Sequence, residues 1–192
     1  DILLYDAEEV PVGDDQRQHI EITRDIAIRF NHRFGDTLVL PKAVHPKAGA
    51  RVMDLQDPTS KMSKSAAADN GLIYMLDDNA TIEKKFKRAV TDSDGVVAYD
   101  RENKAGISNL LDILSAATGT PIPQLVEQYS QYGPLKKDTG DAVIAVIDPI
   151  RSRYNELMND KGQLAQLLKI GNQRAREVAA RTLDRTHKAI GM

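Results

Sequence analysis

Two lysines and two serines stand close together in Lys61-Met62-Ser63-Lys64-Ser65, which we call the lysine loop. No acidic residue lies between the lysines, and the nearest ones in the sequence are Asp57 and Asp69. Lysine carries positive charge on a flexible stem and a hydroxyl donates to an oxygen, so such a loop is suited to hold a chain of phosphates. It would stabilise charge growing on a leaving pyrophosphate. By composition alone, a segment of this kind is more often a solvated surface loop without a ligand.

A second polar cluster, Gly13-Asp14-Asp15-Gln16, stands at a predicted strand-to-helix turn. Glycine permits close approach to the backbone, and the amides of a helix N-terminus offer hydrogen-bond donors. Asp15 could accept from ribose hydroxyls, and Gln16 could present its amide to a small substrate. An ordinary N-cap by Asp14 or Asp15 explains the same residues and, taken alone, is the commoner case.

The C-terminal region is basic. Residues 151–192 hold nine Lys or Arg against four Asp or Glu, whereas the remainder holds 17 against 24. Four of the basic residues share one face of a predicted helix: Arg174, Arg181, Arg185 and Lys188. Such a face could follow a phosphate backbone, but a helix that merely faces solvent would look the same.

Several kinds of chemistry find no support in the sequence. Cysteine is absent, which excludes disulfides, thiolate metal sites and a cysteine nucleophile. The four histidines lack the spacing of metal ligands, so we expect no metal site. There is no Gly-x-Ser-x-Gly elbow and no Gly-rich Walker loop. No window approaches the roughly 20 apolar residues of a membrane span, so we expect no membrane partner.

The elements that must position these residues alternate between strands and helices over the first 95 residues. A helix is expected from about residue 14 to 34, with an apolar stripe made of Ile22, Ile26, Phe30 and Phe34, and with Ile20 and Ala27 beside it. A second helix is expected over residues 81–90. Apolar runs that are typical of strands or extended segments occupy residues 2–5, 10–12, 37–40, 51–55 and 72–76. This alternation predicts an α/β layer.

From residue 96 onwards the pattern is helical. Helices are expected over residues 107–114, 121–129, 138–158, 161–168 and 171–190. Gly133-Pro134 is expected to be a break, and Pro149 should kink the third of these helices. The apolar face of that helix would comprise Val143, Val146, Ile147 and Ile150. We therefore predict two domains, an α/β part over residues 1–95 and an all-α part over residues 96–192.

Taken in order, these segments resemble the class I aminoacyl-tRNA synthetases, and in particular the bacterial tryptophanyl-tRNA synthetases. The lysine loop looks like the second signature of the class, the KMSKS loop. The likeness continues through Asp1-Ile2-Leu3-Leu4-Tyr5, residues 10–19, Gly49-Ala50-Arg51-Val52-Met53, Asp57-Pro58-Thr59, residues 89–93 and residues 106–111. It covers essentially the whole chain, and the combination is more specific than the lysine loop alone.

The resemblance implies the C-terminal part of such an enzyme. Residues 1–95 would be the second half of a Rossmann-type nucleotide-binding domain, and residues 96–192 a helical anticodon-binding domain. The first signature, a His-Ile-Gly-His-like element that holds the ATP phosphates, is missing. The parent enzyme would be a cytoplasmic homodimer that joins L-tryptophan to tRNA(Trp) with ATP and Mg²⁺, whereas this chain alone would be inactive.

The resemblance also implies roles for individual positions. Lys61, Ser63 and Lys64 would act on the ATP phosphates during catalysis. The full set of implied ATP contacts is Gly13, Asp15, Gln16, Val52, Lys61, Met62, Ser63 and Lys64, with Val52 and Met62 near the adenine. Asp1 would accept from the indole N–H of tryptophan, and Gln16 would contact the amino acid and its adenylate. A buried acceptor for that N–H would reject amino acids that lack it.

Three other interpretations remain open on the sequence. The tyrosine-specific relatives share the Gly-x-Asp-Gln turn and the lysine loop. A non-catalytic helical module that binds RNA or protein would also explain the basic C-terminal region. A generic nucleotidyltransferase is a weaker alternative.

Overall fold

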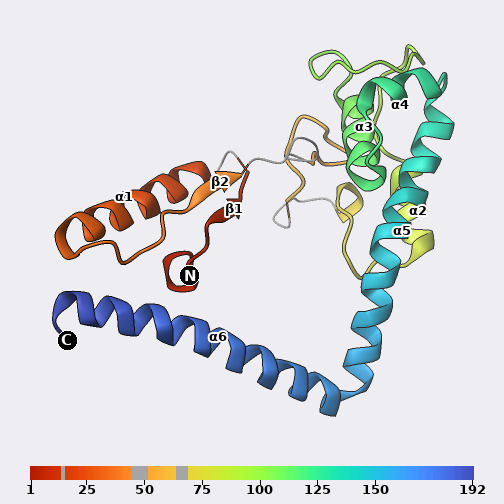
Figure 1. Ribbon diagram of the computed structural model, residues 1–192. Coiled ribbons are helices and arrows are strands. Elements are labelled where there is room, and N and C mark those ends of the chain that lie inside the picture. Colours follow the sequence, from red (N-terminus) through yellow and green to blue (C-terminus); the bar gives the residue numbers. More distant parts are fainter. Residues whose placement is uncertain (14–15, 45–51, 64–68) are drawn as a thin grey trace. The chain divides into compact units, whose positions relative to one another are not determined.

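The computed structural model describes residues 1–13, 16–44, 52–63 and 69–192. The chain forms two compact units (Figure 1). We call Asp1–Lys47 together with Leu157–Met192 the terminal unit, and Ala48–Glu156 the central unit. The predicted division near residue 95 is not confirmed, because the last helix groups with the N-terminal segment.

The terminal unit contains one β-α-β element. Strand β1 (Glu9–Pro11) pairs in parallel with β2 (Lys42–Val44), and helix α1 (Arg17–Phe34) connects them. A crossover helix of this kind is the usual way to join two parallel neighbours. The predicted strand at residues 10–12 and the helix that follows it are thus confirmed, while residues 2–5 form a short 3₁₀ helix, η1 (Leu3–Tyr5), instead of a strand.

The expected strand over residues 37–40 does not form, because one side chain takes its hydrogen bonds. Asn31 Oδ1 accepts from the backbone N–H of Thr37 at 3.1 Å and of Leu38 at 2.8 Å. Its Nδ2 donates to the carbonyl of Leu38 at 2.8 Å. The backbone groups that a sheet would pair are therefore satisfied locally, and the regular strand begins only after Pro41.

The apolar stripe predicted on α1 is mostly not buried. Ile20 and Ala27 are buried, whereas Ile22 is 50% exposed and Ile26 is 54% exposed. The reason is that a two-stranded sheet offers little surface for a helix to cover, while parallel sheets normally carry more strands and are covered on both faces.

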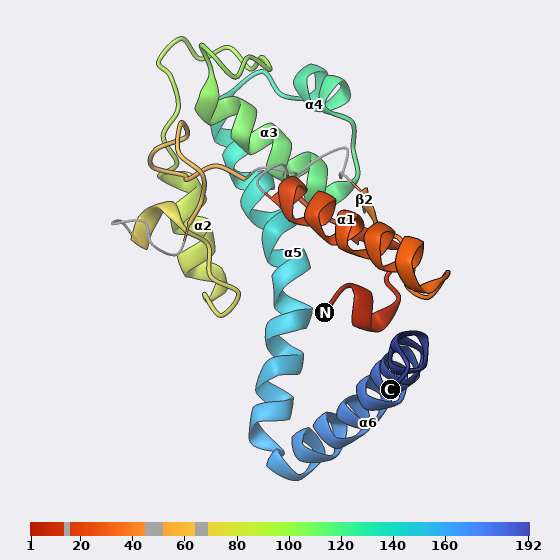
Figure 2. The ribbon, with the colours of Figure 1, turned by 90° about the vertical axis from the view of Figure 1, so that its left-hand side faces the viewer.

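Helix α6 (Lys161–Ile190) completes the terminal unit. The sequence predicted two helices here, but Gly171 does not interrupt the single long one. A mid-helix glycine costs only about 1 kcal/mol relative to alanine, which the remaining turns can carry. Both views show α6 passing beside η1, and the two elements are in contact (Figures 1 and 2).

Four helices surround the hydrophobic core of the central unit. They are α2 (Asn79–Lys87), α3 (Ala105–Thr118), α4 (Ile122–Gln128) and α5 (Tyr132–Asn159), whose last residues belong to the terminal unit. A 3₁₀ turn, η3 (Asp69–Gly71), precedes them. Residues 106–115 of α3 are all buried. The core comprises Leu55, Ile82, Phe86, Ala89, Val97, Ile107, Leu110, Leu111, Ile113, Leu114, Leu125, Tyr129, Leu135 and Ile147.

Three expectations for this unit were wrong. The apolar run at residues 72–76 is not a strand, because Asp77 closes a turn by accepting from the N–H of Tyr74. The pair Gly133-Pro134 lies in the first turn of α5, where proline loses no helical hydrogen bond. The third expectation, the apolar face of α5, was wrong for two of its four residues: Ile147 is buried and Val143 packs against the core, whereas Val146 and Ile150 are about half exposed. The buried residues of α5 are Leu135, Thr139, Gly140 and Ile147.

The helices predicted over residues 81–90, 107–114 and 121–129 are confirmed as α2, α3 and α4. Pro149 stands inside α5, which continues to Asn159. No helix among the described residues is both long and apolar enough to cross a membrane. The α/β character predicted for the first 95 residues is limited, in the described part of the chain, to β1, α1 and β2.

Candidate functional site

The lysine loop leaves from a short β-hairpin. Met53 pairs antiparallel with Lys61, and two further hydrogen bonds join the same strands. The N–H of Met62 donates to the carbonyl of Val52 at 3.0 Å, and the N–H of Asp54 donates to the carbonyl of Ser60 at 2.9 Å. The extended segment predicted near residues 51–55 is thus confirmed from Val52 onwards, and Arg51 lies outside the described residues.

Asp57 stabilises the turn of this hairpin. Its carboxylate accepts from the hydroxyls of Ser60 and Thr59, each at 2.6 Å, and from the N–H of Thr59 at 3.2 Å. These hydrogen bonds, that of Ser60 first, lower the pKa of Asp57 below its usual value. Asp57 is therefore ionised, and its carboxylate is hydrogen-bonded within its own turn.

Gly71, six residues after the lysine loop, is hydrogen-bonded to the same hairpin. The N–H of Leu55 donates to the carbonyl of Gly71 at 3.0 Å. The buried carboxylate of Asp54 accepts from the N–H groups of Gln56 and Asp57, and it lies against Gly71. A Cβ at position 71 would stand 1.9 Å from Asp54 Oδ1, so any other residue there would displace the Asp54 carboxylate from its present position. The segment 61–71 therefore begins and ends on the strand Val52–Leu55.

The structure brings some of the predicted ATP contacts together. Lys61 is exposed on the hairpin, whereas Val52, Met62 and Ser63 are partly buried. Val52 and Met62 pack against the central core and line an apolar cavity of about 320 Å³. Lys64 lies outside the described residues, as does Ser65.

The remaining predicted contacts belong to the terminal unit. Gln16 takes the N-cap position of α1, and its N–H donates to the carbonyl of Gly13 at 3.1 Å. Asp1 is exposed and lies two residues before the start of η1. Asp14 and Asp15 lie outside the described residues.

Three of the four basic residues predicted on α6 are exposed, namely Arg174, Arg181 and Lys188. Arg185 has an internal role instead. Its guanidinium donates to Asp6 Oδ1 at 2.6 Å and to the carbonyl of Thr37 at 2.7 Å, which ties α6 to η1 and to the segment after α1.

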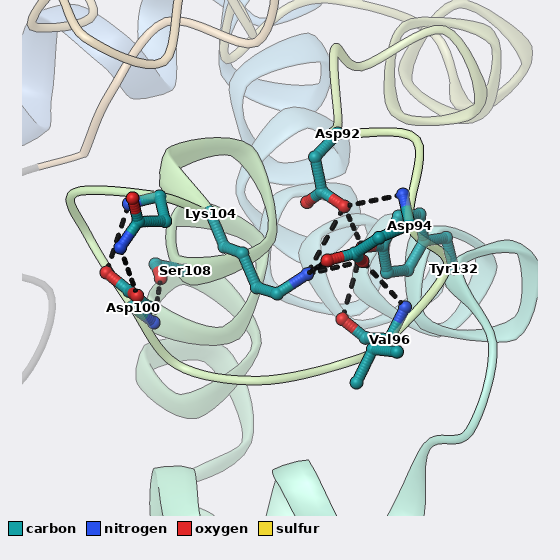
Figure 3. A network of polar contacts seen from close by, with 8 residues as sticks. Asp92, Asp94, Val96, Asp100, Lys104, Ser108 and Tyr132 are labelled. Atoms are coloured by element: carbon teal, nitrogen blue, oxygen red, sulfur yellow. Dashed lines mark hydrogen bonds and ion pairs between the residues drawn. The ribbon is translucent and has the colours of Figure 1, made fainter.

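Sequence reasoning gave no role to a polar network that precedes α3 (Figure 3). Lys104 Nζ lies 3.3 Å from Asp92 and 2.5 Å from Asp94, and the hydroxyl of Tyr132 is within hydrogen-bond distance of both carboxylates. The hydrogen bond from Lys104 lowers the pKa of Asp94, and burial together with the bonds to Asp92 and Asp94 raises the pKa of Tyr132 to about 12. The network ties residues 92–104 to the start of α5.

Sequence reasoning also missed Asn109. Its Oδ1 accepts from the N–H of Met53 at 2.9 Å, and its Nδ2 donates to the carbonyl of Met53 at 2.9 Å. The available signal was an amide within the apolar run Ile107–Leu114, because a buried polar side chain needs a partner. The sequence could not indicate that this partner lies 56 residues away.

Comparison with known proteins agrees with this arrangement. The sequence model described as tRNA synthetases class I (W and Y) matches residues 1–148. The chain therefore belongs to the class I tRNA synthetases, in the family that comprises the tryptophan and tyrosine enzymes.

The relatives are more specific than the family. A tryptophan–tRNA ligase of Mycobacterium leprae is 52% identical over the whole chain, which spans 56% of that protein. The structure of a tryptophanyl-tRNA synthetase from Mycoplasma pneumoniae matches with a TM-score of 0.85 at 35% identity, over 100% of this chain and 58% of that one. The enzyme from Campylobacter jejuni complexed with ADP and tryptophan matches with a TM-score of 0.67 at 31% identity, over 100% of this chain and 59% of that one. The chain thus spans little more than half the length of these relatives.

Proposed function

We propose that this chain is the C-terminal part of a tryptophan–tRNA ligase, which activates tryptophan with ATP and transfers it to tRNA(Trp). The observation that carries the proposal is the hairpin that holds both ends of the segment 61–71 on one strand. Identity of about one half to tryptophan–tRNA ligases over the whole chain supports it, and favours tryptophan over tyrosine as the substrate.

In the proposed reaction a carboxylate oxygen of tryptophan attacks the α-phosphorus of ATP. The bond from that phosphorus to the bridging oxygen breaks, and pyrophosphate leaves with the negative charge. Lys61 and Lys64 would stabilise that charge, and Ser63 would donate a hydrogen bond to a phosphate oxygen. Val52 and Met62 would lie near the adenine. Catalysis would rest on positioning and electrostatics, with no covalent bond to the protein.

The resemblance also implies ligand contacts for four residues of the terminal unit. Gly13, Asp15 and Gln16 would face the nucleotide, Gln16 also the amino acid, and Asp1 would accept from the indole N–H. The Campylobacter jejuni relative, whose structure contains ADP and tryptophan, supports a site for these two kinds of ligand.

Mg²⁺ would enter with the nucleotide. The described residues contain no group of three His, Asp or Glu side chains that could hold a metal ion. We therefore propose that Mg²⁺ is bound mainly by the phosphates of ATP and neutralises part of their charge, as it commonly does in nucleotide sites.

The terminal unit supports a larger nucleotide-binding domain. Its parallel sheet has two strands, and Ile22 and Ile26 on α1 are about half exposed. Further strands and helices would cover them in the full-length enzyme, which the resemblance implies is a cytoplasmic homodimer. The 192-residue chain alone would therefore be inactive.

The decisive experiment joins this chain to the preceding part of the Mycobacterium leprae relative and measures amino-acid-dependent ATP–pyrophosphate exchange. We call this protein the completed enzyme. Exchange with tryptophan and none with tyrosine is expected, and the 192-residue chain alone should give none. Exchange only with tyrosine, or no exchange by a folded completed enzyme, would overturn the proposal, and the latter result with intact tRNA binding would favour a non-catalytic RNA-binding module.

The role of the lysine loop has its own test in the completed enzyme. Lys61→Ala and Lys64→Ala should each slow adenylate formation about 100-fold, because an electrostatic contact realised in the transition state contributes a few kcal/mol. Affinity for ATP should change far less. Lys137→Ala is the control, since Lys137 is a surface lysine paired with Asp141 on α5. Equal losses in rate and ATP affinity would contradict transition-state use of the loop.

We also propose that the exposed basic face of α6 contacts the tRNA backbone. Arg174→Glu and Arg181→Glu should weaken tRNA binding and make its salt dependence shallower. Arg176→Glu makes the same change of charge two residues along the helix from Arg174, on another face, and serves as the control. If all three variants bind tRNA equally, the face has no such role.

A further inference from the structure

We infer that Asn109 on α3 is a positioning residue for the lysine loop. The inference rests on the proposed function in one respect, which is that the loop meets the phosphates of ATP. Everything else in it follows from how the central unit holds the hairpin.

The side chain of Asn109 makes the same pair of hydrogen bonds to Met53 that a neighbouring strand would make. One donor and one acceptor on the amide meet one acceptor and one donor on the backbone, each at 2.9 Å. Asn109 is 3% exposed, so water does not compete for these groups. The backbone N–H and carbonyl of Met53 are thereby fixed to helix α3.

On its other side, Met53 faces the first residue of the lysine loop. Met53 pairs with Lys61, and the flanking bonds Met62 to Val52 and Asp54 to Ser60 lock the register of the hairpin. Met53 therefore lies between Asn109 on one side and the first lysine on the other. A displacement of Met53 relative to α3 would move Lys61 by a similar amount.

Helix α3 is itself fixed against this region at a second point. A Cβ on Gly106 would lie 2.1 Å from the carbonyl oxygen of Val90, so the helix and that backbone are in direct contact. The N–H of Val90 donates to the carbonyl of Leu55 at 2.8 Å. Met53 is thus held against α3 directly, and Leu55 is held against it through Val90. The helix therefore fixes the position of residues 53–55.

Only an amide satisfies both groups of Met53. Aspartate at position 109 would keep an acceptor for the N–H but would place a second acceptor against the carbonyl. Leucine has a similar size and offers neither a donor nor an acceptor. Serine is smaller and can reach at most one of the two groups. The three substitutions therefore disturb the hairpin by different routes while leaving the lysine loop itself unchanged.

A matched control is available next to Asn109. Ser108 is also buried on α3, at 1% exposure, and its hydroxyl accepts from the N–H of Asp100 at 2.9 Å (Figure 3). Ser108→Ala removes a buried hydrogen bond from the neighbouring position, and that bond reaches the loop before α3 instead of the hairpin. It measures what a loss of stability in α3 does by itself.

The experiment uses the completed enzyme with Asn109→Leu, Asn109→Asp and Ser108→Ala. We expect both Asn109 variants to lower the single-turnover rate of adenylate formation at least 10-fold, since misplacement by about 1 Å can cost 100-fold, with less than a threefold change in KM for ATP. Amide hydrogen exchange within residues 52–62 should accelerate in these variants. Ser108→Ala should leave the rate within twofold and should not accelerate exchange in that segment.

Equal effects of Asn109→Leu and Ser108→Ala on the rate would overturn the inference, as would unchanged exchange in residues 52–62. If Asn109→Leu does not fold, Asn109→Ser is judged by the same two criteria. The proposed function fails separately, when the unsubstituted completed enzyme shows no tryptophan-dependent exchange.

Discussion

The two units differ in how they are held together. The central unit encloses a continuous core to which α2, α3, α4 and α5 all contribute. In the described part of the terminal unit, the buried apolar side chains are Ile20, Ala27 and Pro41, whereas Ile22, Ile26 and Ile28 on α1 are about half exposed. Its elements are joined mainly by polar contacts, among them Arg24 with the carbonyl of Pro41 and Arg185 with Asp6. The central unit therefore has a core of its own, whereas most of the apolar stripe on α1 in the terminal unit is exposed.

The largest expected effect is in the central core. Phe86→Ala should lower the free energy of unfolding of the 192-residue chain by about 3–5 kcal/mol, because the ring is 1% exposed and its removal leaves a cavity. Ile26→Ala on α1 should change it by less than about 0.5 kcal/mol, because that side chain is already half in solvent. Urea denaturation measures both. Similar losses for the two variants would remove the distinction between the units.

A smaller effect is expected where one side chain replaces a strand in the terminal unit. Asn31→Ala should cost about 1–2 kcal/mol, because it leaves two N–H groups and one carbonyl without their partner in a partly buried setting. Hydrogen exchange at Thr37 and Leu38 should accelerate. His32→Ala, at the next and exposed position of α1, should change neither quantity. Unaltered exchange in Asn31→Ala would show that the segment is held by other contacts.

The ion pair that attaches α6 to η1 should contribute less. Asp6 and Arg185 are each about one-third exposed, so solvent screens their attraction. A double-mutant cycle with Asp6→Asn and Arg185→Gln should give a coupling energy of about 0.5–1 kcal/mol. The coupling should fall in high salt. A coupling near zero would mean that the ion pair does not hold α6 and that other contacts do, among them the hydrogen bond from Arg185 to the carbonyl of Thr37.

The smallest effect concerns one phenol at the edge of the central core. Burial, and then the hydrogen bond to Asp138, raise the pKa of Tyr129 to about 12. A pKa raised by folding contributes stability that is complete below pH 10 and is lost as the pH rises through 12. Difference absorbance of phenolate should show that Tyr129→Phe removes one group titrating near pH 12, and that Asp138→Asn moves it lower. If the group that disappears in Tyr129→Phe titrates near pH 10 instead of pH 12, the buried position of Tyr129 is contradicted.

Much of the local structure could be predicted from neighbouring residues. Asp78 caps α2 by accepting from the N–H of Thr81, and Gly35 and Gly119 end α1 and α3. These caps were not among the stated predictions, but they depend on groups within a few residues of each other, whose geometry the chain itself dictates. The extended backbone before the lysine loop follows from the same kind of local pattern.

The errors have a different origin. Residues 37–40 have the composition of a strand, but the side-chain amide of Asn31 makes the hydrogen bonds to Leu38 that a neighbouring strand would make. The apolar positions of α5 were recognised, yet its buried face depends on where Phe86 and α3 lie. The stripe on α1 was predicted to be buried, but this chain provides too little sheet to cover it. Asn31 lies six and seven residues from Thr37 and Leu38, but its side-chain contact with them cannot be recognised from composition. The partners of α5 lie further away in the sequence, and the two described strands are too few to cover α1.

The sequence by itself determined the lysine loop, the likeness to a class I synthetase and the approximate position of most helices. Tertiary structure alone decided that Asn109 meets Met53, that Arg185 meets Asp6 and that the last helix packs beside η1. The physical reason is the separation along the sequence over which each interaction acts. Caps and periodicity act over one or two turns and can be read from the sequence, whereas a hydrogen bond between residues 56 or 179 positions apart exists only once the chain has folded.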